Sequence, residues 1–136
     1  MATTPARNRH PRAAPITDPE NSSYLQAGIA AFNAGSHWHA HEEWEHLWLG
    51  LEGDDKVFAQ GLIMAAAMLV QYDKGVRRGV VNHWDNVQLR LPPYAPVRWG
   101  IDVAGLLRQL APFADDANNE IPLSRGTSTV QIGRKD

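Results

Sequence analysis

Apolar side chains recur at helical spacing along most of this chain, which predicts amphipathic helices separated by short breaks. The first helix is expected to begin after Asp18, an N-cap that precedes a proline, and to end before Gly35. Ser36 can cap a second helix, which is expected to end near Gly50. The apolar face of the first helix comprises Tyr24, Leu25, Ile29 and Phe32.

A third helix is expected from a cap at Asp54 or Asp55 to about Tyr72, and it is apolar around nearly its whole circumference. Its segment GLIMAAAMLV, residues 61–70, is too short to span a bilayer. The glycine and alanines in this segment let neighbouring helices approach closely. We therefore expect this helix to be the central, buried helix of the domain.

The remainder of the chain predicts two further helices. Gly75 and Gly79 bracket a turn, after which apolar residues return at helical spacing up to Leu91. The run LPPYAPVRWG, residues 91–100, must interrupt the helix because adjacent prolines remove backbone donors and disfavour helical geometry. A fifth helix is expected from about Asp102 to Leu110.

These elements predict an all-α fold, a compact bundle of about five helices in one domain over residues 17–113. Residues 1–16 are rich in Pro, Ala, Thr and Arg and show no periodicity, so we expect a disordered N-terminal leader. Residues 114–136 are polar and are expected to form an irregular, extended C-terminal tail.

Composition and charge narrow the possible functions. The chain has no cysteine, so any metal would be bound through nitrogen and oxygen, and a reducing cytoplasm is the expected location. Eight carboxylates and no Lys or Arg lie between Arg12 and Lys56, whereas the segment 74–108 is mildly basic. Scattered cations without interleaved aromatics do not predict nucleic-acid binding, and nothing here predicts a membrane protein.

The densest candidate chemistry is the segment SHWHAHEEWEHLW, residues 36–48. His41, Glu45 and Trp48 form the pattern H-x-x-x-E-x-x-W, and His37 lies one turn upstream. On a helix these residues share one face with Trp44, whereas His39 and His46 point elsewhere. We expect His41 and Glu45 to be buried beside the two tryptophans, because side chains of this size belong to a core.

Three interpretations of this face remain open: a His–Glu hydrogen bond that satisfies the core, a metal site, and an acid/base pair. His37, His41 and Glu45 have the composition of a two-histidine, one-carboxylate site for a divalent transition metal. However, His37 and Glu45 are about 12 Å apart along a helix axis, so another helix would have to supply a ligand.

The chain resembles an uncharacterised prokaryotic family, the domain of unknown function numbered three hundred and nine. The resemblance spans residues 25–110 and includes the H-x-x-x-E-x-x-W/Y signature at His41, Glu45 and Trp48. Further matching positions are Phe32, Asn33, Gly35, Ala40, Glu42, Trp44, Gln60, Gly61, Leu62, Ile63, Gly75 and Gly79. The resemblance implies an all-α bundle and a suspected metal role for the motif, but no known reaction.

Two hypotheses about function follow. In the first, the protein is a helical metal-binding protein similar to a metal-dependent hydrolase, with His41 as ligand and Glu45 as ligand or general base. Trp44 and Trp48 would then exclude solvent, and Gln60 would face the pocket or satisfy a nearby polar group. In the second, the His–Glu pair is a buried polar clasp in a non-enzymatic bundle that binds a protein or a small ligand.

Residual apolar surface predicts a homodimer in either case. A domain of this size has difficulty covering five tryptophans, so the contact is expected near Trp38 or around residues 92–99.

Overall fold

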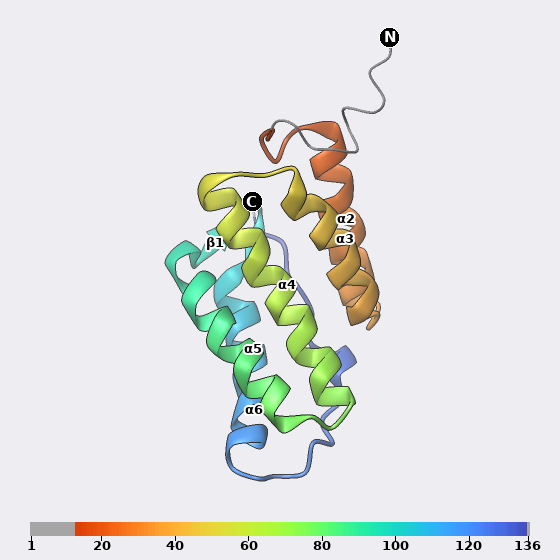
Figure 1. Ribbon diagram of the computed structural model, residues 1–136, viewed down its shortest axis with the longest axis vertical. Helices are drawn as coiled ribbons and strands as arrows, with labels where there is room; N and C mark the ends of the chain where they lie inside the picture. The colour runs from red at the N-terminus through yellow and green to blue at the C-terminus, as the bar shows by residue number, and fades with distance from the viewer. Residues whose placement is uncertain (1–12, 136) are drawn as a thin grey trace.

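The computed structural model describes residues 13–135 and contains five α-helices that follow one another along the chain (Figure 1). Their bounds are α2 (Pro19–Asn33), α3 (His37–Leu49), α4 (Gly53–Asp73), α5 (Arg77–Arg90) and α6 (Val103–Asn118). The only strands in this part of the chain are the two-residue strands β1 (Val97–Arg98) and β2 (Ile101–Asp102). The predicted all-α bundle is therefore confirmed.

Local sequence accounts for where the first helices begin and end. The Asp18 carboxylate accepts hydrogen bonds of 3.1 Å from the backbone N–H groups of Glu20 and Asn21, as expected of an N-cap. Gly35 separates α2 from α3 with a positive φ of 84°, a conformation that favours glycine. Ser36 stands at the N-cap of α3 but its side chain forms no capping hydrogen bond.

Each helix packs against the next, so that α4 lies between α3 and α5 with α2 and α6 beyond them (Figure 1). The core between these helices is formed by large apolar side chains, among them Phe32, Trp44, Phe58, Leu62 and Leu106. One stripe of α4, which includes Val57, Gln60 and Met64, is not fully buried. The central helix therefore has an open side, which the sequence pattern did not predict.

The proline-rich break is a short connection between α5 and α6. It consists of a 3₁₀ turn (η1, Pro92–Tyr94) and the hairpin of β1 and β2, in which Val97 pairs with Asp102. Trp99 and Gly100 form the tip of the hairpin, and both have positive φ. Asp102 then caps α6 by accepting a 3.0 Å hydrogen bond from the Gly105 backbone.

The last helix is longer than predicted. α6 continues past residue 113 to Asn118, although Pro112 lies inside it, because Phe113, Asp116 and Ala117 are buried on the side that faces the bundle. Tertiary packing thus offsets the hydrogen bond that proline cannot donate. The predicted irregular tail begins only after this helix.

Residues 119–135 return along the bundle and pack against it, and Val130 and Ile132 are buried. Asn33 at the end of α2 exchanges two hydrogen bonds with Ile132, donating at 3.1 Å and accepting at 2.7 Å. A short 3₁₀ turn (η2, Thr127–Thr129) replaces the extended arm expected there, and its Thr127 hydroxyl donates to the Asp73 carboxylate at 2.9 Å. The C-terminal segment is therefore part of the folded domain.

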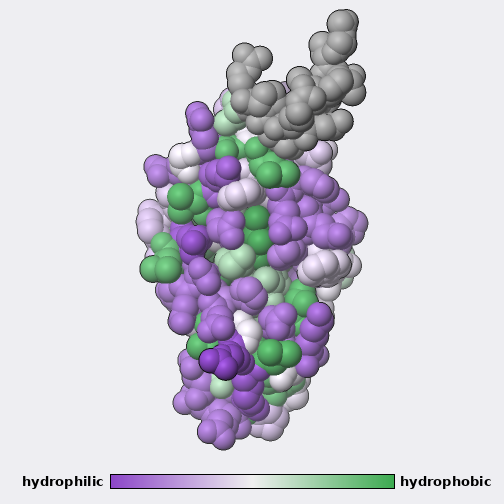
Figure 2. Space-filling model, in the orientation of Figure 1, coloured by the Kyte–Doolittle hydropathy of each residue, from purple (hydrophilic) through white to green (hydrophobic). Residues whose placement is uncertain are grey.

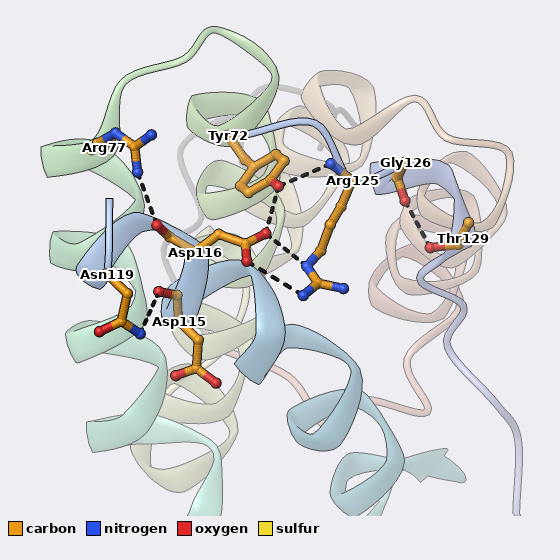
Figure 3. Close-up of polar contacts among 8 residues, drawn as sticks. All are labelled: Tyr72, Arg77, Asp115, Asp116, Asn119, Arg125, Gly126 and Thr129. Carbon is orange, nitrogen blue, oxygen red and sulfur yellow. Dashed lines mark hydrogen bonds and ion pairs between the residues drawn. The ribbon is translucent and has the colours of Figure 1, made fainter. Parts of the chain in front are cut away.

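The buried carboxylate of Asp116 links the C-terminal segment to the helices through hydrogen bonds (Figure 3). Asp116 of α6 accepts hydrogen bonds from the Tyr72 hydroxyl at 2.8 Å and from Arg125 Nε at 2.7 Å. The Arg125 guanidinium is the main reason that the pKa of Asp116 is lowered. The carboxylate is thus held ionised inside the protein by two donors from distant parts of the chain.

The predicted leader lies mostly outside the described residues. Its last four residues, 13–16, are described and contact the domain: the Ala14 backbone N–H donates to the Gly50 carbonyl at 3.0 Å. Asn21 holds the same segment by donating to the Ala14 and Pro15 carbonyls. Among residues 13–135, no helix has the length and apolarity needed to cross a membrane.

Candidate functional site

The motif residues lie along α3, but they are not equally buried. The His41 side chain is only 15% exposed, whereas that of Glu45 is 58% exposed. Their closest atoms, His41 Nδ1 and Glu45 Oε1, are 3.6 Å apart, beyond hydrogen-bonding distance. The expectation that both would be buried is therefore wrong for Glu45, because α4 covers only one side of this face.

Trp44 was predicted to line a pocket, but in the structure it does not. Its indole is completely buried between α3 and α2, and its N–H donates a 3.3 Å hydrogen bond to the Leu25 carbonyl. The ring packs against Gly28 and Phe32 of α2. Trp44 is therefore a core residue, because the helical face that carries the motif is wide enough to contact both α2 and α4.

His37 is buried as well, with an exposed fraction of 3%. Its ring meets the edge of Phe32 at 4.8 Å between centroids, and neither ring nitrogen has a hydrogen-bond partner among residues 13–135. Burial lowers the pKa of His37, an effect that the charge of nearby Asp73 partly offsets. His37 is therefore a neutral imidazole packed in the core.

The predicted metal ligands do not come together. Within the described residues, no three or more His, Asp or Glu side chains are placed so that they could hold one metal ion. His37 faces Phe32, and the Glu45 carboxylate lies at the surface. The set His37, His41 and Glu45 thus does not fit a metal centre, as the length of the helix between its ends had indicated.

The motif borders a hollow between α3 and α4 with a volume of about 490 Å³. Glu45 and Trp48 of the motif lie on its α3 side, and Gln60 and Met64 lie on its α4 side. The remaining lining residues are Glu42, His46, Leu49 and Ile63. In the view of Figure 2, apolar side chains form several separate patches among mostly polar side chains.

A second hollow of about 510 Å³ continues the first one along α4. The two hollows share Trp48 and Gln60, and the second extends to Lys56 of α4 and Arg90 of α5. The Lys56 ammonium lies 4.0 Å from the centre of the Trp48 ring, a cation–π contact. Trp48 and Gln60, which the sequence predicted to line a pocket, therefore border both hollows and mark the midpoint of the groove that the two neighbouring hollows form together.

His83, Lys56 and Met64 lie near the motif but were not identified from the sequence as candidate site residues. His83 of α5 lies near enough to His41 that a charge on His41 lowers the pKa of His83, although burial is the larger cause. The Nδ1 atoms of His41 and His83 are both buried and have no hydrogen-bond partner in the described residues. Lys56, Gln60 and Met64 follow one another at helical spacing on α4, which is the sequence signal that could have identified this open stripe.

Trp38 is the most exposed tryptophan near the motif, with an exposed fraction of 60%. Its ring stacks on His41 at 5.2 Å between centroids and 8° between planes. The indole thus covers one side of the His41 ring while its own outer side remains open to solvent. His39 and His46 are exposed, as predicted.

Comparison with protein families finds a match for part of this chain. The sequence model of the Domain of unknown function (DUF309) matches residues 25–83. This segment of the chain is similar to DUF309. The matched segment contains the H-x-x-x-E-x-x-W motif, the α4 stripe and His83, whereas Arg90, α6 and the C-terminal segment lie outside it. Neither the curated proteins nor the solved structures contain a match to this chain.

Proposed function

We propose that this protein is a binding domain that holds a small organic molecule in the groove over α4. The observation that carries the proposal is that two neighbouring hollows share Trp48 and Gln60 as lining residues. Each hollow is of the size that small-molecule sites have, about 300–1,000 Å³, and combines an apolar lining with a few polar groups.

The polar groups at the midpoint support binding because they are not used by the fold. The Gln60 side chain forms no hydrogen bond within residues 13–135, although it is partly buried. Its amide offers both donors and an acceptor to a ligand that lies across it. Trp48 adds a partly exposed aromatic ring, and both residues are held on helices, which position a site more rigidly than loops do.

The exposure of Glu45 disfavours the buried His–Glu clasp and the metal site of the two earlier hypotheses, and it is compatible with small-ligand binding. A polar clasp would need a buried carboxylate in hydrogen-bonding contact with His41, whereas Glu45 lies in the open groove 3.6 Å from the imidazole. A hydrolase that uses a metal bound by the motif is not supported, since the three predicted ligands lie apart.

The proposal is tested by nuclear magnetic resonance on isotope-labelled protein with a panel of small polar and aromatic compounds at millimolar concentration. Groove binders should shift the indole N–H signal of Trp48 and the side-chain amide signals of Gln60. The indole signal of Trp99, which packs against Phe58 in another part of the fold, should remain unchanged. The proposal is wrong if no compound shifts the two groove signals, or if every shift lies elsewhere.

A matched pair of variants links binding to the groove. Gln60→Leu removes the amide at the midpoint and should weaken binding of any compound identified in this way. Gln88→Leu makes the same change at an exposed position of α5 outside the groove and should leave binding unaltered. Equal affinities for the two variants would place the ligand elsewhere on the protein.

A further inference from the structure

The two halves of the groove carry opposite charge. The half between α3 and α4 contains the carboxylates of Glu42 and Glu45, and the half that reaches α5 contains the cations of Lys56 and Arg90. No ion pair joins either carboxylate to either cation within the described part of the chain. The charges are therefore separated along the groove and do not neutralise each other.

The acidic half lacks a cationic partner. Glu42 is exposed and forms no hydrogen bond or ion pair within residues 13–135. The imidazole of His41 lies 3.6 Å from Glu45, and His46 lines the same hollow as the two carboxylates. Ile63 and Met64 form an apolar wall beside these carboxylates. Two carboxylates next to an apolar wall suit an ammonium group on an aliphatic chain, which contributes donors and no acceptor.

The basic half has donors without a carboxylate partner. The Lys56 ammonium rests on the Trp48 ring, and Arg90 donates to the neutral Asn86 side chain at 2.7 Å. An arginine has five N–H donors, so most of those on Arg90 remain for another acceptor. Together these two cations suit a carboxylate.

The rise per residue of an α-helix gives an estimate of the distance between the two charged groups of a ligand. Along α3, Glu45 is about 4.5 Å and Glu42 about 9 Å from the level of Trp48, at a rise of about 1.5 Å per residue. Lys56 lies against the Trp48 ring and so marks the level at which the basic half begins. A ligand that spans both halves therefore separates its ammonium and carboxylate by about 5–9 Å.

We propose that the groove recognises a zwitterion whose ammonium and carboxylate are joined by a short apolar chain, as in an ω-amino acid. The ammonium binds between Glu42 and Glu45, the carboxylate binds Lys56 and Arg90, and the chain lies over Trp48. This inference rests on the proposed function and adds the chemical class of the ligand. A ligand with one charge leaves one half of the groove unused, and an α-amino acid places its charges too close together to reach both halves.

Three probes of matched length test the proposal: ε-aminocaproate, hexylamine and hexanoate. Chemical shifts of Trp48 and Gln60 are followed as each compound is added. ε-Aminocaproate should bind at least about tenfold more tightly than either probe with a single charge, since a hydrogen bond to a charged group contributes about 1.5–3 kcal/mol. Equal binding of all three, or tighter binding of hexylamine or hexanoate, would overturn the proposal.

Variants assign each charge to its half of the groove. Glu45→Gln should weaken ε-aminocaproate and hexylamine but not hexanoate, and Lys56→Met should weaken ε-aminocaproate and hexanoate but not hexylamine. Glu43→Gln is the control, because Glu43 contacts His39 on another side of α3. If neither Glu45→Gln nor Lys56→Met changes the relative affinities of the three probes, the two charges do not bind in the halves assigned to them, even if ε-aminocaproate binds.

The outcome also separates this inference from the proposed function. If compounds from the general panel shift Trp48 and Gln60 but the charge series shows no preference for the zwitterion, the groove is a binding site and the ligand class is wrong. If nothing shifts these signals, both proposals fail.

Discussion

The indole of Trp44 lies so close to Gly28 of the neighbouring helix that a Cβ atom at residue 28 would overlap the ring. Alanine is ordinarily the better residue in a helix interior by about 1 kcal/mol. Here the added methyl group has no room, because Trp44 is fully buried and its N–H is bound to the Leu25 carbonyl. The closeness of α2 and α3 therefore depends on a residue without a side chain.

We predict that Gly28→Ala destabilises the protein by about 1–3 kcal/mol, the usual cost of overpacking a core. Urea unfolding followed by circular dichroism measures the change. Gly126→Ala is the control, because a Cβ at this exposed position would meet its nearest neighbour, Thr129 Cγ2, at an ordinary contact distance of 3.6 Å. If both variants are equally stable, the contact between Trp44 and Gly28 does not limit the packing of α2 on α3.

Acidification should destabilise the fold through His37. Burial lowers the pKa of His37 below its ordinary value of 6.5, so the unfolded chain binds a proton at a higher pH than the folded protein does. Stability is therefore full above pH 6.5 and is lost as the pH falls from 6.5 toward the lowered pKa. His83 acts in the same direction, since its pKa is lowered too.

Unfolding free energies measured from neutral to mildly acidic pH test this prediction. His37→Leu should reduce the loss of stability on acidification, because the leucine takes up no proton when the chain unfolds. Leu89→Gln changes an exposed position without adding or removing a titratable group and should keep the wild-type pH dependence. If the unfolding free energy of His37→Leu decreases with falling pH as steeply as that of the wild type, then folding does not lower the proton affinity of His37.

Loss of the Tyr72 hydroxyl should weaken the attachment of the C-terminal segment. Tyr72 donates to Asp116 at 2.8 Å and accepts a 3.0 Å hydrogen bond from the Arg125 backbone N–H (Figure 3). Because Tyr72 is buried, Tyr72→Phe leaves both partners short of a hydrogen bond, and we expect a loss of about 1–3 kcal/mol.

Hydrogen exchange and urea unfolding measure this effect together. Amide protons of residues 125–132 should exchange faster in Tyr72→Phe, because the segment that they belong to has lost an attachment point. Tyr24→Phe is the control, since the Tyr24 hydroxyl makes only a long, 3.5 Å hydrogen bond at the surface. Unaltered exchange in the segment would mean that Asp116 and Arg125 suffice to hold it.

The exposed ring of Trp38 predicts self-association. Trp38 is 60% exposed beside His41, and a symmetric dimer would cover its outer face. Sedimentation equilibrium at micromolar concentration should detect a dimer, and Trp38→Gln should shift it to the monomer. Leu89→Gln removes another exposed apolar side chain, on α5, and should not change the assembly state. A wild-type protein that is monomeric over this range would refute the prediction.

The sequence by itself determined the helices and the motif. Asp18, Gly35 and the proline-rich run act on the backbone within a few residues, so their effects are readable without knowledge of the rest of the chain. The shared face of His41 and Glu45 follows from helical periodicity in the same way. The family resemblance added the expectation of an all-α bundle, and the fold confirms it.

Only the tertiary structure decided which parts of the apolar faces are covered. α4 is apolar nearly all round, yet α3 and α5 leave one stripe of it open, and that stripe is the floor of the groove. Glu45 is exposed for the same reason, and Lys56 and Arg90 reach the groove from two different helices. These features depend on contacts between residues far apart in the chain, which local periodicity does not encode.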